Sequence, residues 1–284
     1  MLLSLRGRAL LAALAALLAL AGGACAAPAT VVAPGASAVP AGSATDLFVD
    51  PDTAAARQVR QWLAEGRAAD AQLLRKIAEQ PVPNWLTKPA GEVGDEVRDY
   101  VAKARAAGQR PYFVTYHIPG RDCGSYSGGG AGGEDEYRRW FAEVADAVRG
   151  SNALIVVEPD AVPQTISCGK GAERLDLLAD SVAALKAAGA TVYLDAGNPG
   201  FIDDTGRLVD ALQRAGVGQA DGFSLNVANF HPTRANIAFG KELSAALGGK
   251  HFVIDTSRNG NGAVDEHEIN GGPSWCNPPG RALG

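Results

Sequence analysis

The chain has 284 residues, and its formal net charge is −5, from 26 basic and 31 acidic side chains that form no basic run. Because a nucleic-acid partner requires a positively charged patch, this charge pattern argues against nucleic acid as a ligand. Hydrophobic residues make up 46% of the chain, which is enough to bury the core of one large domain.

The first 27 residues have the three parts of a secretory signal peptide. Arg6 and Arg8 are positively charged, residues 9–21 are apolar, and residues 24–26 (Ala-Cys-Ala) fit a cleavage site. The apolar run is short for a bilayer span, so we expect cleavage; a retained membrane anchor and a lipid on Cys25 are the alternatives. The predicted location is secreted, extracellular or associated with the cell envelope, with no stable membrane attachment after cleavage.

Residues 28–45 are rich in Pro, Ala, Gly and Ser, a composition that predicts a flexible lead-in. Residues 46–284 are expected to form one folded domain in which short apolar runs alternate with helical patterns. The predicted strands, in chain order, are residues 47–49, 112–116, 153–157, 191–194, 222–225 and 251–254.

Helical patterns separate these strands. Apolar side chains recur at helical spacing in residues 141–148 and 175–185, and Gly108, Gly150 and Gly189 stand where three helices are expected to end. Repeated strand–helix units predict an α/β fold with a parallel sheet. With six such units, a (β/α) barrel is favoured over an open sheet.

Polar residues follow the carboxyl end of every predicted strand. In a barrel those ends build the active site. They include Asp50, Tyr116, Asp160, Asp195, Asn226 and Asp255. A scaffold has no need of carboxylates there, whereas a polar ligand rich in hydroxyl groups would use them.

Asp122 and Asp160 lie beyond successive strands and are the candidate acid–base pair. One explanation is that they only cap helices or solubilise loops. The other is glycoside hydrolysis, in which a carboxylic acid protonates the leaving oxygen. A second carboxylate nearby would raise the pKa of that acid by like-charge repulsion, and Arg121 would help to keep the other carboxylate ionised.

Three cysteines remain after the expected cleavage, namely Cys123, Cys168 and Cys276, and an odd number in an exported protein is unusual. Cys123 and Cys168 follow the two aspartates closely, so a disulfide between them would clamp the two loops. A redox or metal role is the alternative, but the chain has no CxxC motif and no histidine cluster. We expect neither a metal nor a cofactor.

The four tryptophans fall into two groups. Trp85 and Trp275 stand in predicted loops beside polar residues, where they could stack on sugar rings or serve as hydrophobic plugs. Trp62 and Trp140 lie on helical patterns and are interpreted as packing residues.

Two further motifs are disfavoured. Residues 128–133 satisfy G-x-G-x-x-G, but a dinucleotide turn follows its strand directly, and here about ten residues intervene. Residues 255–266 imitate a calcium loop, but they follow a predicted strand, whereas such loops follow a helix.

Six segments, in this order along the chain, resemble glycoside hydrolase family 6, the cellulases that cut β-1,4-glucan with inversion. They are residues 114–124, 154–160, 193–197, 226–229, 253–260 and 275–278. The resemblance is to the secreted actinobacterial enzymes and covers residues 46–284. It implies a catalytic domain with a distorted parallel (β/α) barrel, a monomeric endo-β-1,4-glucanase, and cellulose or cellooligosaccharides as the bound partner.

The resemblance also implies a part for each matching residue. Asp160 would be the general acid, Asp122 would raise its pKa, and Tyr116 would crowd the sugar at the point of cleavage. Sugar contacts would come from Trp85, Trp275, Phe201, Asp195 and Asn226. Arg121 and Ser127 would support the acid pair, and Cys123 and Cys168 match the family's first disulfide.

The chain also departs from the family pattern. Asn198 stands where histidine is usual, and Gly128 stands where the family has a serine that helps to hold the attacking water. The family's chains continue beyond the equivalent of Gly284 with the final barrel strand, so we expect a truncated domain that lacks its last strand and is impaired in activity. A non-catalytic cellulose-binding relic is the alternative. The short stretch from Asp160 to Cys168 favours an open cleft and internal cuts.

Overall fold

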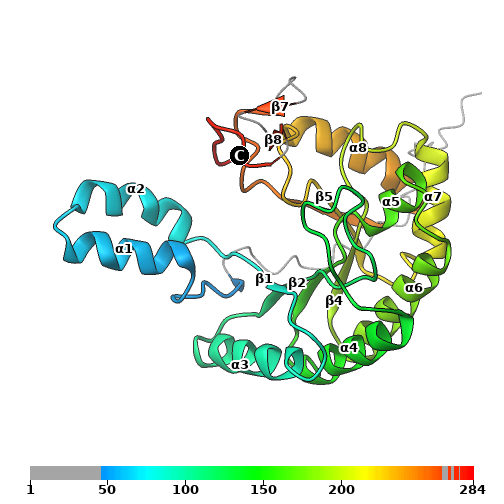
Figure 1. The fold of residues 1–284 in the computed structure, drawn as a ribbon, viewed down its shortest axis with the longest axis horizontal. Coiled ribbons are helices and arrows are strands. Elements are labelled where there is room, and N and C mark those ends of the chain that lie inside the picture. The colour runs from blue at the N-terminus through cyan, green and yellow to red at the C-terminus, as the bar shows by residue number, and fades with distance from the viewer. Residues whose placement is uncertain (1–45, 264–267, 270–271, 275) are drawn as a thin grey trace, which may run out of the picture. The chain divides into compact units, whose positions relative to one another are not determined.

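The computed structural model describes residues 46–263, 268–269, 272–274 and 276–284 (Figure 1). The predicted signal peptide and lead-in lie outside the described residues, as does Trp275.

Six parallel strands form one sheet, and their spatial order follows their order in the chain. They are β1 (Asn84–Leu86), β2 (Tyr112–Thr115), β3 (Leu154–Val157), β4 (Thr191–Asp195), β5 (Gly222–Leu225) and β6 (His251–Ile254). Each strand pairs in parallel with the next, as Val114 does with Val156. The predicted parallel α/β class is confirmed, with β1 and β6 at the two edges of the described sheet. A short antiparallel pair, β7 (Glu268–Ile269) and β8 (Gly272–Pro273), follows.

The described helices, in chain order, are α1 (Ala54–Ala64), α2 (Ala68–Ala78), α3 (Val93–Ala106), α4 (Glu134–Ala147), α5 (Ala161–Ser167), α6 (Glu173–Ala187), α7 (Thr205–Arg214) and α8 (Thr233–Ala246). Five helices, α3, α4, α6, α7 and α8, cover the outer side of the sheet, whereas α1 and α2 precede β1 and pack against each other (Figure 1). In Figure 1, α3, α4, α6, α7 and α8 follow one another around the sheet in chain order, and each contacts the next.

The core lies between these helices and the sheet. Its largest fully buried side chains include Trp140, Tyr137 and Phe113. The predicted apolar stripes are confirmed, since Phe141 and Val144 of α4 and the matching residues of α6 are buried. Trp140 packs in this core as expected, and its indole nitrogen donates to the carbonyl of Lys88 at 2.7 Å.

The prediction for the first strand was wrong. Residues 47–49 are not a strand, and only Leu47 forms an isolated bridge, to Arg110. An apolar residue stands at position 48 because the ring of Phe48 packs edge-on against Tyr100, 5.1 Å away. Phe48 does not belong to the sheet. The first strand is β1, so Trp85 lies in a strand and not in a loop. Its three residues follow Pro83 and are too few to show strand periodicity.

Candidate active site

A cavity of about 680 Å³ opens where the strands end. It is lined by several residues that the sequence singled out: Trp85, Tyr116, Asp122, Cys123, Ser127, Asp160, Cys168 and Phe201. These residues are far apart in the chain, and the parallel sheet brings them together because the carboxyl ends of its strands meet at one edge.

Asp160 sits at the end of β3 and begins α5, with left-handed backbone geometry at φ 68°. Its backbone nitrogen donates to Oδ2 of Asp195 at 2.9 Å. Burial of the Asp160 carboxyl, followed by the negative charge of Asp122, raises its pKa to about 6. A carboxyl group in this state keeps its proton into the weakly acidic range, as a general acid must.

Asp122 organises the glycine-rich loop that follows it. Its Oδ1 accepts from the backbone nitrogen of Gly124 at 3.0 Å, and its Oδ2 accepts from that of Ser127. The loop then returns past β2 at Gly130, where φ is 91° and an added Cβ would lie 2.0 Å from the carbonyl oxygen of Ile118. Only glycine fits at that position, so Gly130 is required for the loop to fold as it does.

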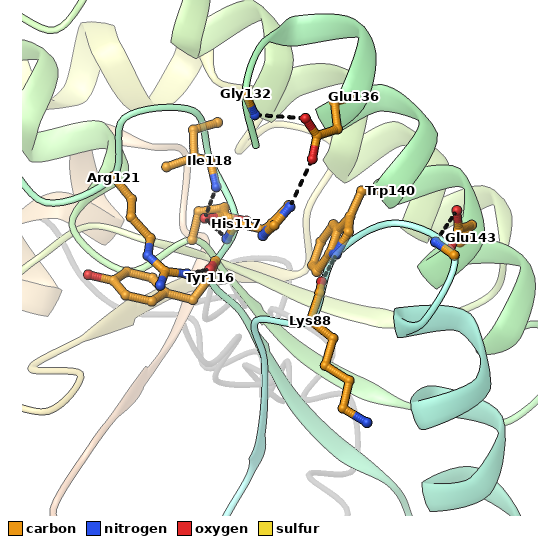
Figure 2. Close-up of polar contacts among 11 residues, drawn as sticks. Lys88, Tyr116, His117, Ile118, Arg121, Gly132, Glu136, Trp140 and Glu143 are labelled. Atoms are coloured by element: carbon orange, nitrogen blue, oxygen red, sulfur yellow. Dashed lines mark hydrogen bonds and ion pairs between the residues drawn. The ribbon is translucent and has the colours of Figure 1, made fainter. Parts of the chain in front are cut away.

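Tyr116 is held from two sides (Figure 2). Arg121 donates from Nη1 to its carbonyl oxygen, and the guanidinium lies 4.6 Å from the centre of its ring. The ring of Trp85 meets Tyr116 edge to face at 5.4 Å. Burial, with the charges of Asp160 and Asp122 behind it, raises the pKa of Tyr116 to about 12. Its hydroxyl is therefore neutral at any working pH.

The next residue, His117, anchors the start of this loop. Its ring stacks on Trp140 at 4.8 Å, and Nε2 lies 3.9 Å from the carboxylate of Glu136 (Figure 2). Burial lowers the pKa of His117. Its backbone nitrogen donates to the carboxylate of Glu158 at 2.9 Å.

Glu158 is a buried carboxylate that we assigned no part from the sequence. It also accepts from the backbone nitrogen of Ile118, at 3.0 Å. Its complete burial raises its pKa to about 7. Glu158 belongs to the same turn as Asp160, so it ties the loop after β2 to the loop after β3.

Asp195 and Asn226 lie beneath the cavity, and neither is among the described residues that line it. Asp195 is 1% exposed, and besides Asp160 it accepts from the nitrogen of Gly197 at 3.0 Å and the hydroxyl of Ser224 at 3.1 Å. Burial, then the charge of Asp160, raises its pKa to about 7. Asn226 is also fully buried, and its amide donates to the carbonyl of Asp255 at 2.9 Å.

The disulfide between Cys123 and Cys168 is present, which confirms that prediction, and the two Cα atoms are 6.5 Å apart. It joins the residue after Asp122 to the residue that ends α5. Cys276 is an exposed free thiol.

Other residues that line the cavity were missed, among them Gln164, His231 and Arg258. Arg258 follows β6, in one of the polar segments that the sequence places at the carboxyl ends of strands (the strand-end rule). Its Nη2 donates to the carbonyl of Ala228 at 2.8 Å. Within the described ranges, no group of three or more His, Cys, Asp or Glu side chains is arranged to hold a metal ion. Among those same residues, no helix has the length and apolar character needed to cross a bilayer.

Comparisons with known proteins agree with this geometry. Residues 42–284 match the family model for glycosyl hydrolases family 6. Endoglucanase A of Cellulomonas fimi is 43% identical over 241 residues, which are 84% of this chain and 50% of that protein. Endoglucanase 1 of Streptomyces halstedii is 36% identical over 262 residues, which are 88% of this chain and 78% of that protein.

Among solved structures, the endoglucanase Cel6 from Mycobacterium tuberculosis, in complex with a thio-linked cellooligosaccharide derivative, superimposes with a TM-score of 0.76 at 40% identity. The match covers 84% of this chain and 80% of that one. The chain spans about half the length of the first curated relatives it matches, 50% for the Cellulomonas protein and 52% for endoglucanase A of Thermobispora bispora. From the family match and these relatives, the chain belongs to glycosyl hydrolases family 6.

Proposed function

We propose that this protein is a secreted, monomeric endo-β-1,4-glucanase that hydrolyses cellulose-type glucan with inversion of configuration. The observation that carries the proposal is the meeting of Asp160 and Asp122 in one cavity with aromatic walls. It is supported by relatives named endoglucanases and by a structural neighbour solved with a cellooligosaccharide derivative.

Asp160 is assigned as the general acid. With a pKa raised to about 6, it gives its proton to the glycosidic oxygen as the bond to the anomeric carbon breaks. The negative charge of Asp122 favours the protonated form of Asp160 before the reaction. The same charge then stabilises the positive charge that develops on the sugar ring. Water attacks the anomeric carbon from the opposite face and gives up a proton to a general base, and this attack inverts the configuration.

The aromatic side chains bind the sugar. Flat apolar faces are offered to the glucan by Trp85, Tyr116 and Phe201. Tyr116 interacts electrostatically with both aspartates and crowds the sugar ring at the cleavage point. Trp275 is assigned a similar stacking part. Ser127 is assigned to the attacking water because it lines the cavity beside Asp122.

Asp195 and Asn226 act through their neighbours. Asp195 holds the backbone of Asp160 through one hydrogen bond, and so fixes where the acid points. Asn226 holds the loop after β5, since its Oδ1 accepts from the nitrogen of His231 at 3.1 Å. We infer a positioning role for both in place of the sugar contacts expected from the resemblance.

The test is hydrolysis of cellohexaose followed by proton NMR of the anomeric signals. We expect the first product to carry the α-configuration and Asp160→Asn to abolish turnover while leaving cellohexaose binding intact. The exposed Asp99→Asn is the matched control and should behave as the unmodified protein. A first product with the β-configuration would refute inversion. Quenching of tryptophan fluorescence without any hydrolysis would refute the enzyme and support the non-catalytic relic.

A further inference from the structure

Arg174, in the first turn of α6, is a buried arginine that no step of the proposed reaction uses. Only 5% of its surface is exposed. Its Nη2 donates to the carbonyl oxygens of Pro119 at 2.9 Å and Gly120 at 3.0 Å, and its Nη1 donates to Oε1 of Gln164 at 3.2 Å. All three acceptors are uncharged, and the negative charges of Glu158 and Glu173 also favour the cation. Hydrogen bonds and charge together therefore hold Arg174 inside the protein.

The acceptors belong to the two loops that carry the aspartates. Pro119 and Gly120 directly precede Arg121 and Asp122 in the chain. Gln164 lies in α5, and its backbone nitrogen donates to the carbonyl oxygen of Asp160 at 2.9 Å. One guanidinium therefore bonds on one side to the loop of Asp122 and on the other to the helix that Asp160 begins.

The choice of arginine is informative. A buried cation costs several kcal/mol, and an apolar residue of similar volume often stabilises a core as well or better. A planar guanidinium, however, presents donors in a fixed fork that can reach acceptors on two segments at once, whereas lysine is a point charge on a flexible stem. The arrangement is suited to holding two loops in register more than to filling space.

The disulfide makes a second tie between the same two segments. It joins Cys123, one residue after Asp122, to Cys168, whose backbone nitrogen donates to the carbonyl of Gln164 at 3.3 Å. The two ties differ in depth, because Arg174 is buried, whereas Cys123 and Cys168 line the cavity.

We propose that Arg174 is a positioning residue that fixes the separation of Asp122 and Asp160 from within the protein interior, in parallel with the disulfide. The inference rests on the proposed function of these aspartates as the acid pair. If both ties constrain one distance, either alone holds it approximately, and loss of both releases it. The effects of removing them must then be more than additive.

The experiment compares Arg174→Lys in the disulfide-bonded protein and in a Cys123→Ser/Cys168→Ser background. The readouts are kcat and KM for cellohexaose and the titration midpoint of the Asp160 carboxyl by carbon-13 NMR, which needs no turnover. We expect kcat to fall about tenfold with the disulfide present, as for loss of one charged hydrogen bond. Without the disulfide the fall should exceed a hundredfold, with KM little changed and the midpoint moved toward that of an ordinary aspartate.

Arg214→Lys is the control, because Arg214 also bonds to α6, through Asp176 at 2.9 Å, but on the protein surface. It should change neither readout. If Arg174→Lys does not fold, Gln164→Leu removes the same bridge from its other end and should show the same dependence on the disulfide.

Additive effects, or an unmoved Asp160 midpoint in a folded protein that lacks both ties, would overturn the positioning role. If the unmodified protein hydrolyses no glucan and the midpoint still moves as expected, the proposed function fails and the positioning role stands.

Discussion

Replacing Asp122 by asparagine isolates the part that one charge plays in preparing the acid. The pKa of Asp160 is raised from 3.8 to about 6, by burial first and by Asp122 second. Because Asp122 is the smaller cause, it accounts for less than half of that rise, which is about one pH unit at most. Since one pH unit corresponds to about 1.4 kcal/mol, the interaction is worth on the order of 1 kcal/mol. Asp122→Asn should therefore lower the pKa of Asp160 to between about 5 and 6.

The assay is the pH dependence of kcat/KM for cellohexaose, whose alkaline limb reports loss of the acid's proton in the free enzyme. The limb should move to lower pH by about 0.5 to 1 unit, and the carbon-13 midpoint of Asp160 should move with it. The control is Asp99→Asn, which removes an exposed carboxylate from α3. An alkaline limb that stays in place, or moves to higher pH, would refute the reasoning, because removal of a nearby negative charge must lower the pKa of Asp160.

Three further predictions concern stability and binding. Gly130→Ala should lower the free energy of unfolding by roughly 2 kcal/mol or more in urea titrations, because the added Cβ would meet the carbonyl of Ile118. Gly133→Ala is the control and should lower it far less, because there is open space around Gly133. Equal losses of stability would contradict the geometry. Trp85→Ala should weaken cellohexaose binding about tenfold in calorimetry without moving the alkaline limb, whereas Trp85→Phe should retain most of the affinity. Asp195 has a folded-state pKa of about 7 against 3.8, so the stability linked to its proton is present below pH 4 and is lost as the pH rises through 7. Asp195→Asn should flatten that decline by up to roughly 3 kcal/mol in urea titrations between pH 4.5 and 7.5. Curves parallel to those of the unmodified protein would contradict this prediction.

The strand-end rule found much of the site because it depends on two strong signals. Buried parallel strands are continuous apolar runs, and the residues that follow them in a barrel face the ligand. Tyr116, Asp122 and Asp160 were found in this way, and the cavity contains all three. The rule gives no depth, however, so Asp195 and Asn226 looked equivalent to Asp160 although both are buried beneath the cavity.

The first strand and Arg174 were missed for different reasons. β1 has three residues, which are too few to show a periodic pattern. The segment at 47–49 was predicted as a strand because it is an apolar run, but Phe48 is apolar in order to pack in the core. Arg174 did leave a signal. It stands four residues before Leu178, on the buried side of α6, where a charged residue in an apolar stripe indicates a buried hydrogen-bonding role. Its acceptors, two backbone carbonyls and a glutamine, could not be read from any motif.

The floor of the cavity explains why two aspartates with similar settings act differently. Asp160 follows β3 and Asp195 is the last residue of β4, and burial is the first cause of the raised pKa of each. The oxygens of Asp195 accept hydrogen bonds from Asp160, Gly197 and Ser224. These bonds fix the backbone around the acid. Asp160 instead lines the cavity, where the negative charge of Asp122 raises its pKa. A proton on Asp160 can therefore reach a substrate oxygen, whereas a proton on the buried Asp195 cannot reach the substrate.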